Sequence, residues 1–222
     1  IIGNLDGFNE SEKVSIELFP ELEKYILHRL WEVNQILKKC IKEFNFHLMF
    51  TTLLNFCSND LSSFYFDIRK DSIYCDKSDS ITRQSARTLL DILFNNLVRW
   101  FAPSLVFTCE EAWKARGNTT SIHLEDFKII SNSYRNDKIN KKWKAIKEVR
   151  KVITGALELK RADKMIGSSL EASINIYRSS KNISDFQDIN WAEISITSSA
   201  KLLEKEDHNK AFSIDEIKGV AV

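Results

Sequence analysis

The stretch 46–75, FHLMFTTLLNFCSNDLSSFYFDIRKDSIYC, is dense in apolar and aromatic residues and decides the fold of the chain around it. Its first part predicts a helix, because apolar residues recur at steps of three and four, at Phe46, Met49, Phe50, Leu53 and Cys57. Ser58-Asn59-Asp60 predicts a turn and a helix N-cap, since short polar side chains accept backbone N–H bonds there. A second helix follows. Two helices this rich in aromatics need partners on more than one side, which predicts the middle of a helical bundle.

The flanking segments supply the other helices of this bundle. Pro20 can start a helix whose core stripe is Leu22, Tyr25 or Ile26, Leu30, Val33, Leu37 and Ile41. Ser80 or Thr82 caps a helix that reaches about residue 102 and buries Ala86, Leu89, Leu90, Leu93, Leu97 and Phe101. After Pro103, Thr108 and Glu111 have the spacing of a capping box for a short last helix, which gives Glu111 a structural task. Gly117-Asn118 ends that helix, and 121–124 is expected to be extended.

The last third of the chain has a different pattern. We expect a boundary near residue 131 and then a long helix. Its buried side is Ile139, Trp143, Ile146, Val149 or Arg150, Ile153 and Leu157, and its other side is Lys141, Lys144, Lys147 and Lys151. About 24 residues span on the order of 36 Å as a helix. Gly167 is expected to permit a tight turn, and strands 173–177, 192–197 and 211–214 with a short helix at 183–189 form a small α/β layer. The predicted division is thus an arm or linker at 1–19, a helical bundle at 20–130, and a basic helix with a small α/β domain at 131–222.

Composition and charge narrow the class of protein. Hydrophobic residues make up 43% and charged residues 28% of the 222, values typical of a soluble globular protein. Net charge is only +1, but residues 138–164 hold ten Lys or Arg against three acids, a local +7, so the rest sums to −6. Such segregation indicates an anionic partner. No apolar run reaches membrane-spanning length, and the start at Ile1 and the strand-like IKGVAV at the end lead us to expect a fragment of a longer protein.

The four cysteines are Cys40, Cys57, Cys75 and Cys109, and no pair has ligand spacing. We therefore expect buried, reduced thiols and no metal site. His47, beside Phe46, is expected to be packed rather than to act as a ligand or base.

Several motifs together resemble the anticodon-binding domain of bacterial isoleucyl-tRNA synthetases. They are Asn55-Phe56-Cys57, Asp60-Leu61-Ser62, Lys70-Asp71 with Tyr74, Ala102-Pro103, and Thr108-Cys109-Glu110-Glu111-Ala112-Trp113. The stretch 164–172, KMIGSSLEA, likewise resembles the junction after the bundle in isoleucyl- and valyl-tRNA synthetases. It departs from the lysine-methionine-serine-lysine-serine loop of class I synthetases, because the second lysine is absent. Ser72-Ile73 stands where the family usually has arginine-leucine, which removes a phosphate-binding candidate there.

The resemblance covers most of residues 10–220 and implies a mainly α fold, with a helical anticodon-binding bundle followed by a small α/β junction domain. It implies the tRNA-recognition part of a cytoplasmic ligase that joins isoleucine to its tRNA using ATP. Its partners would be isoleucine tRNA and the catalytic and editing domains of the parent chain. The chain has no histidine-isoleucine-glycine-histidine signature and no Gly-rich phosphate loop. We therefore expect binding without catalysis and no cofactor here, whereas the parent enzyme would use ATP and could carry a zinc module.

Aromatic and Arg side chains suit unstacked bases, and lysines suit stem phosphates. The candidate RNA-binding residues are Trp31, Lys38, Arg83, Arg87 and Trp113 on the bundle, and Lys144, Lys147, Arg150, Lys151, Arg161, Lys164 and Ser168 on the long helix and junction. Several of these candidate residues could have a structural role instead. Trp31 could be a core anchor, Arg83 and Arg87 could lie on a solvated face where Arg87 pairs with Asp91, and Ser168 could serve only the turn.

Two functions of other classes compete with RNA binding. The first is a helical interaction module that docks an acidic protein through the basic helix. The second is a hydrolase that uses Cys57 or Cys75 with His47, although a cysteine within an aromatic core is a poorly exposed nucleophile.

Overall fold

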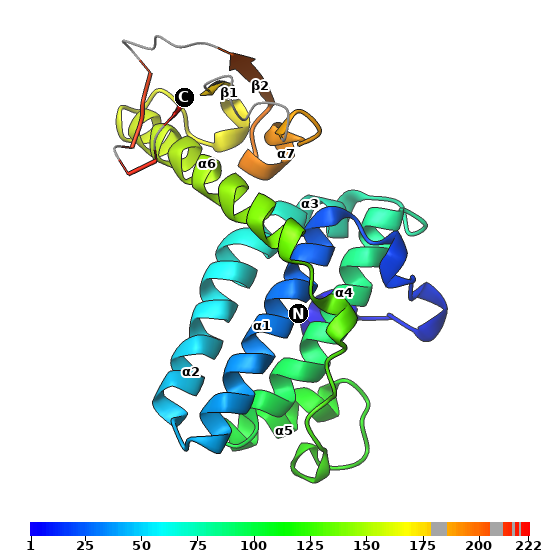
Figure 1. Ribbon diagram of the computed structural model, residues 1–222. Helices are drawn as coiled ribbons and strands as arrows, with labels where there is room; N and C mark the ends of the chain where they lie inside the picture. The colour runs from blue at the N-terminus through cyan, green and yellow to red at the C-terminus, as the bar shows by residue number, and fades with distance from the viewer. Residues whose placement is uncertain (179–185, 205–210, 215, 218) are drawn as a thin grey trace. The chain divides into compact units, whose positions relative to one another are not determined.

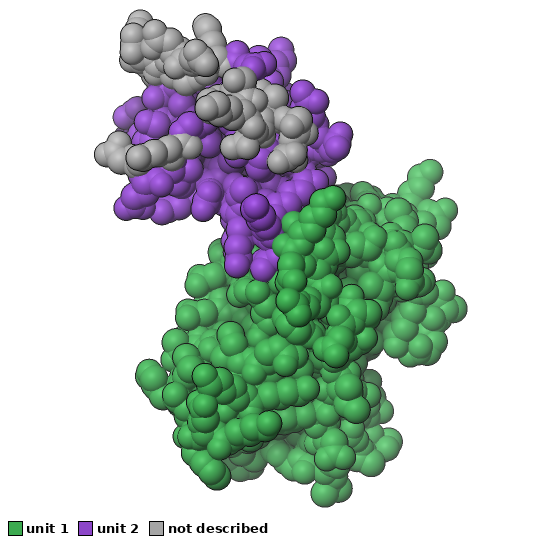
Figure 2. Space-filling model, in the orientation of Figure 1, with its two compact units in different colours: residues 1–139 green, residues 140–222 purple. Residues whose placement is uncertain are grey.

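The computed structural model describes residues 1–178, 186–204, 211–214, 216–217 and 219–222. The chain divides into two compact units, residues 1–139 and 140–222 (Figure 2). The division inferred from the sequence stays a prediction, and the two units are described separately below.

Unit 1 is a helical bundle, as predicted (Figure 1). Its α-helices are α1 (Glu21–Lys42), α2 (Phe46–Asn55), α3 (Asp67–Cys75), α4 (Ile81–Phe101) and α5 (Val106–Ala115). Pro20 and Ser80 stand at the N-caps of α1 and α4, and the Ser80 side chain accepts a bond from the Arg83 N–H. Most of the two predicted stripes is buried, with Leu22, Ile26, Leu30, Val33 and Leu37 on α1 facing a core that also holds Ala86, Leu89, Leu90 and Leu93 of α4. The ends of the stripes are not, because Ile41 is 38% exposed and Phe101 is half-buried.

The central stretch is one uninterrupted helical run, so the predicted turn at 58–60 is wrong. A π-helical segment, Phe56–Phe66, joins α2 to α3. Ser58 does not cap a helix but donates its hydroxyl to the Leu54 carbonyl at 2.7 Å, the bond to residue i−4 that competes with capping. Asp60 is buried and accepts a bond from Arg29 of α1 at 3.1 Å. The polar residues that suggest a turn therefore satisfy partners inside the helical run and across the bundle.

A buried ion pair ties α1 to the end of this run. Arg69 donates to both carboxylate oxygens of Glu23, at 2.6 and 3.0 Å, and Glu23 is fully buried. The hydroxyl of Tyr65 donates to the same carboxylate at 3.1 Å. Burial, together with this carboxylate, raises the pKa of Tyr65 well above its ordinary value, so the hydroxyl remains a donor. The group is a bidentate charge pair in which a single lost partner would strand a buried charge.

Residues 1–19, expected to be a linker or arm, pack against the bundle as short 3₁₀ segments at Ile2–Leu5, Glu10–Glu12 and Ile16–Leu18. Leu5 is fully buried in a cluster with Phe94 and Val98 of α4, Trp113 of α5 and Ile122. The arm is therefore part of the core.

The predicted capping box on α5 is wrong, because the helix begins at Val106 and Thr108 lies inside it. Glu111 is exposed, and Glu110 has the structural task instead. The Glu110 carboxylate accepts bonds from the Ser121 hydroxyl and the Ile122 N–H, both at 2.9 Å, and pairs with Lys114 at 3.0 Å. Together these contacts lower the pKa of Glu110 from 4.5 to about 2, and the contact with Lys114 contributes most. They hold Ile122–Leu124, which is a 3₁₀ turn rather than the expected extended piece.

Left-handed backbone ends several helices, and in three cases the residue is not glycine. Phe44 after α1, Lys164 after the long helix α6 (Asp137–Ala162) and Ile196 after α7 (Trp191–Ser195) have φ of 54°, 58° and 56°. After α1, the Asn45 N–H bonds the Cys40 carbonyl at 2.8 Å and the Phe44 N–H bonds the Ile41 carbonyl at 3.3 Å, the pairing of a Schellman motif. A side chain at this position costs about 1–2 kcal/mol relative to glycine. After α6 the left-handed residue is Lys164, and Gly167 lies in a bend three residues later.

Unit 2 contains most of α6 and a three-stranded sheet within the described residues. Its strands are β1 (Ser173–Arg178), β2 (Ser199–Glu204) and β3 (Val220–Ala221), in the order β2-β1-β3. β1 pairs in parallel with β2 from Ser173↔Ser199, and antiparallel with β3 at Tyr177↔Ala221. Ile174 and Ile176 of β1 are buried, as are Trp143, Ile146, Val149, Val152, Ile153 and Leu157 of α6.

Four predictions for unit 2 have different outcomes. The strand at 173–177 is confirmed as β1. The strand at 192–197 is wrong, because Asn190 caps α7 there and Trp191 and Ile194 are buried at helical spacing. No strand is assigned at 211–214 among the described residues, although Phe212 exchanges two bonds with Val222 at 2.8 and 2.9 Å. The helix expected at 183–189 lies partly outside the described residues.

The buried pair yields a stability prediction. Glu23→Gln removes the charge that compensates Arg69, and we expect a loss of roughly 3–5 kcal/mol in the free energy of unfolding, measured by urea denaturation. The exposed Glu111→Gln should change it by less than about 0.5 kcal/mol. The double variant Glu23→Gln/Arg69→Met should lose less than Glu23→Gln alone, and a fully additive double variant would show that the pair is not coupled.

The contacts of Glu110 yield a prediction of pH dependence. Its pKa is lower in the folded chain than in the unfolded one, so its contribution to stability is complete above about pH 4.5 and is lost as pH falls toward about 2. Between these limits the thermal midpoint of the wild type should fall more steeply with acid than that of Glu110→Gln. Parallel curves for the two proteins would contradict the assignment.

Candidate nucleic-acid interface

One face of α6 is lined with lysines. Lys144, Lys147 and Lys151 lie three and four residues apart, so they project from the same side of the helix, and Lys141 flanks them one turn earlier. Lys141, Lys144 and Lys151 are exposed and Lys147 is half-buried, while the apolar residues of α6 are buried on the other side. We call Lys144, Lys147 and Lys151 the lysine face. Over its whole length α6 carries nine basic and three acidic residues, a net +6.

Acidic side chains lie near this face. Lys151 pairs with Glu216 at 3.6 Å, and both side chains are more than 60% exposed. Glu148 is exposed within the helix. Because exposed ion pairs contribute only about 0–1 kcal/mol and are screened by salt, such a carboxylate can be displaced by a phosphate. Lys144 and Lys151 therefore present exposed cationic groups on this face, whereas Lys147 is half-buried and has a partner of its own.

Three of the other candidates near α6 already have partners. Arg150 donates its Nε to the Ile194 carbonyl at 2.8 Å, which ties α6 to α7. Arg161 donates to the Ser169 hydroxyl at 3.1 Å and also pairs with Glu158. The Ser168 hydroxyl accepts from the Leu170 N–H at 3.3 Å, so it forms the turn before β1. Lys164 is exposed at the left-handed residue that ends α6.

On the bundle, Trp31 and Lys38 differ in their access to a ligand. Lys38 is exposed on α1. Trp31 is half-buried, donates its indole N–H to Asn132 at 3.1 Å, and has the Arg135 guanidinium 5.4 Å from its ring centroid. That guanidinium covers a ring face that a base would need for stacking.

Arg83, Arg87 and Trp113 are engaged within unit 1. Arg83 donates to the Asp76 carbonyl at 2.7 Å. Arg87 does not pair with Asp91 as expected but bonds Glu12 at 2.7 Å and the Asp6 carbonyl at 2.6 Å, which holds the arm. Trp113 is 5% exposed, stacks on Phe94 at 6.3 Å and lies beneath Arg99. These three side chains serve the core and the arm, and we leave them out of the surface proposed below.

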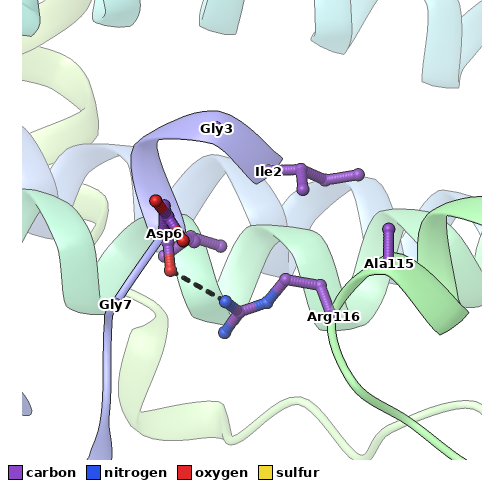
Figure 3. A pocket seen from close by; sticks show the side chains of 7 residues that line it. Ile2, Gly3, Asp6, Gly7, Ala115 and Arg116 are labelled. Carbon is purple, nitrogen blue, oxygen red and sulfur yellow. Dashed lines mark hydrogen bonds between the residues drawn. The ribbon is translucent and has the colours of Figure 1, made fainter.

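A cavity of about 350 Å³ lies between the arm and the end of α5 (Figure 3). It is lined by Ile2, Gly3, Leu5, Asp6, Gly7, Ala115 and Arg116. Arg116 points toward the arm, where it donates to the Leu5 carbonyl at 2.9 Å, and it also meets Asp91 at 3.4 Å. The guanidinium that lines this cavity is thus already used to fasten the arm.

The turn between α1 and α2 has a surface that the sequence analysis did not identify. All residues from 41 to 48 are exposed, including Phe44 at 79% and Phe46 at 49%. The expectation that Phe46 belongs to the core stripe and that His47 is packed is therefore wrong. The signal was present in FNFHLMF, where three phenylalanines fall within seven residues, more than one helix face can bury. We call residues 41–48 the hairpin tip.

The thiols offer little support for a hydrolase. Burial raises the pKa of Cys57 to about 11 and that of Cys109 above its ordinary value, so these thiols are protonated at neutral pH. Cys57 is ten residues from His47 along one helical run, which corresponds to roughly 15 Å. Cys75 is exposed rather than buried as expected. In the part of the chain that the structure describes, no three Cys, His or acidic residues cluster as metal ligands.

Among the helices within the described ranges, none combines the length and apolar character needed to cross a bilayer.

Comparison with known proteins identifies the family. The family described as the anticodon-binding domain of tRNA ligase matches residues 23–176. The chain is 42% identical over 224 residues to the isoleucine–tRNA ligase of Bartonella henselae and 43% identical over 224 residues to that of Brucella abortus (strain 2308), in both cases over 100% of this chain and 23% of the relative. It is 46% identical over 206 residues to that of Pelagibacter ubique, over 90% of this chain and 22% of the relative.

The chain therefore belongs to the anticodon-binding domain family of tRNA ligases, and the resemblance seen in the sequence is confirmed. It spans about a quarter of the length of the curated relatives it matches.

The contacts of Arg87 yield a prediction about the arm. Arg87→Gln removes a charged bond to Glu12, and we expect the free energy of unfolding to fall by about 1–3 kcal/mol. Limited proteolysis should also cut within residues 1–19 faster than in the wild type. Lys128→Gln, at an exposed site, is the control. Unchanged proteolysis of the Arg87 variant would show that the arm is held by its apolar residues and Arg116 without help from Arg87.

Proposed function

We propose that this chain recognises tRNA as the anticodon- and stem-binding part of an isoleucine–tRNA ligase, and that it carries no aminoacylation site of its own. The observation that supports this most is the family match over residues 23–176, together with the names of its relatives. The lysine face adds a physical reason, since regularly spaced lysines on a helix can follow the phosphates of an RNA stem.

The proposal extends to the rest of a longer enzyme. Isoleucine activation would need ATP bound in a catalytic domain, and the catalytic and editing domains of the parent chain would be partners of this one. Zinc would belong to a separate module of that parent. Such an enzyme would act in the cytoplasm.

The contact between Lys151 and Glu216 favours a second candidate, because it shows that the lysine face also accepts a carboxylate. A helical interaction module would dock an acidic protein there. The two functions can be distinguished by measuring RNA binding. A module built to dock an acidic protein would bind folded tRNA and random double-stranded RNA equally well.

Charge reversal on the lysine face tests phosphate binding. The triple variant Lys144→Glu/Lys147→Glu/Lys151→Glu should bind isoleucine tRNA at least about tenfold more weakly, and the slope of log affinity against log salt should shrink by about two. Filter binding over a range of salt concentrations measures both quantities.

The matched control carries the same change in net charge elsewhere. Lys77→Glu/Lys128→Glu/Lys201→Glu alters three exposed lysines outside α6 and should reduce affinity less and keep most of the slope. Equal losses in the two triple variants would show that net charge, not the lysine face, governs binding. Comparing isoleucine tRNA with an anticodon-swapped version then tests specificity, because equal affinities would overturn anticodon recognition while leaving tRNA binding in place.

A further inference from the structure

The hairpin tip lies at one end of the bundle (Figure 1). Its large apolar side chains are exposed to solvent. Phe44 and Phe46 are 79% and 49% exposed, and Ile41 and Leu48 beside them are 38% and 45% exposed. The two rings lie edge to face, with centroids 6.3 Å apart and planes at 83°. This arrangement leaves a broad ring face uncovered.

The backbone at Phe44 adds a second observation. Phe44 occupies the left-handed position of the Schellman motif that ends α1, where glycine is the favoured residue. A phenylalanine here strains the backbone and gains no buried contact in return, since its side chain is exposed. The chain therefore keeps an aromatic ring where folding alone would favour glycine.

The charges around the tip indicate what the rings would meet. Lys38, Lys39 and Lys42 are all exposed on the last turns of α1, and His47 is exposed on α2. Glu43 is the acidic residue within 38–47 and lies 3.9 Å from Lys39. Three lysines and one glutamate give this segment a net charge of +2 with His47 neutral. Exposed aromatic faces among cations match an unpaired base joined to phosphates better than they match an apolar protein surface.

We propose that the hairpin tip binds an unpaired nucleotide of a tRNA loop, with the base stacked on Phe44 or Phe46 and Lys38, Lys39 and Lys42 holding adjacent phosphates. This inference rests on the proposed tRNA function and adds to it the site where a loop base is held. Because stacking uses a face that every base has, the tip would supply affinity and position more than base identity.

The variant Phe44→Gly separates the two properties of this residue. It relieves the left-handed strain and removes the ring, so we expect its thermal midpoint to be equal to or higher than that of the wild type. The double variant Phe44→Gly/Phe46→Ala should nevertheless bind isoleucine tRNA at least about fivefold more weakly, because aromatic stacking contributes strongly to each bound base. The matched control is Tyr74→Ala, which removes another exposed ring some 28 residues along the helical run, roughly 40 Å from Phe46.

Base stacking can be observed directly with tRNA transcripts that carry 2-aminopurine at one loop position at a time. At one or more positions the fluorescence should change when the wild-type chain binds, and this change should be absent with the double variant at saturating protein. It should persist with the Tyr74→Ala control and with the triple Lys→Glu variant of the lysine face, once enough protein is added to saturate.

The outcomes separate this inference from the proposed function. If the wild-type chain binds no tRNA, the proposed function fails and the tip with it. If the wild type binds but the double variant has the same affinity and the same 2-aminopurine response, tRNA recognition stands and the tip is overturned. The tip would then be a contact surface for another protein.

Discussion

The bundle depends on two polar ties between α1 and the antiparallel helical run beside it. Glu23 binds Arg69 through both carboxylate oxygens, and Arg29 binds Asp60 two turns further along α1. Apolar faces can slide past one another by a turn with little loss, whereas these bonds form in one register only. With the helices in this register, Asp60 lies inside a π-helical segment and the α1–α2 turn lies beyond the packed core. The hairpin tip is therefore free of the contacts that hold the rest of α1 in place.

Much of the fold could be predicted from periodicity, because α1, α4 and α6 are long and strongly patterned. The incorrect predictions concern polar residues that can either form a turn or cap, or bond to another part of the helical run or bundle. Ser58 and Asp60 look like turn formers but bond to Leu54 and Arg29, and Thr108 lies inside a helix that starts earlier. Which use prevails depends on partners distant in sequence, and local patterns do not contain that information.

Only part of the candidate interface could be predicted from the sequence. The lysine face follows from spacing alone, because lysines opposite a buried stripe must point outward. Arg87 could not be assigned, since its partner Glu12 lies 75 residues away, and neither could Trp113, whose ring closes the core around Leu5. Phe46 was predicted to be in the core because apolar residues at helical spacing usually are. It is exposed because the helix extends past the core here.

The pairing of β1 with β3 bears on how the chain is made. The core cluster of unit 1 draws its members from residues 5–122, so it can close while the rest of the polypeptide is still being synthesised. Unit 2 differs, because the bonds of β1 to Val220 and Ala221 and those of Phe212 to Val222 need residues 212–222. During synthesis, α6 would therefore leave the ribosome with its apolar side uncovered. Some sixty further residues must be synthesised before the sheet that covers it is complete. During that interval the nascent helix would be a client for chaperones, whereas the finished bundle before it would not.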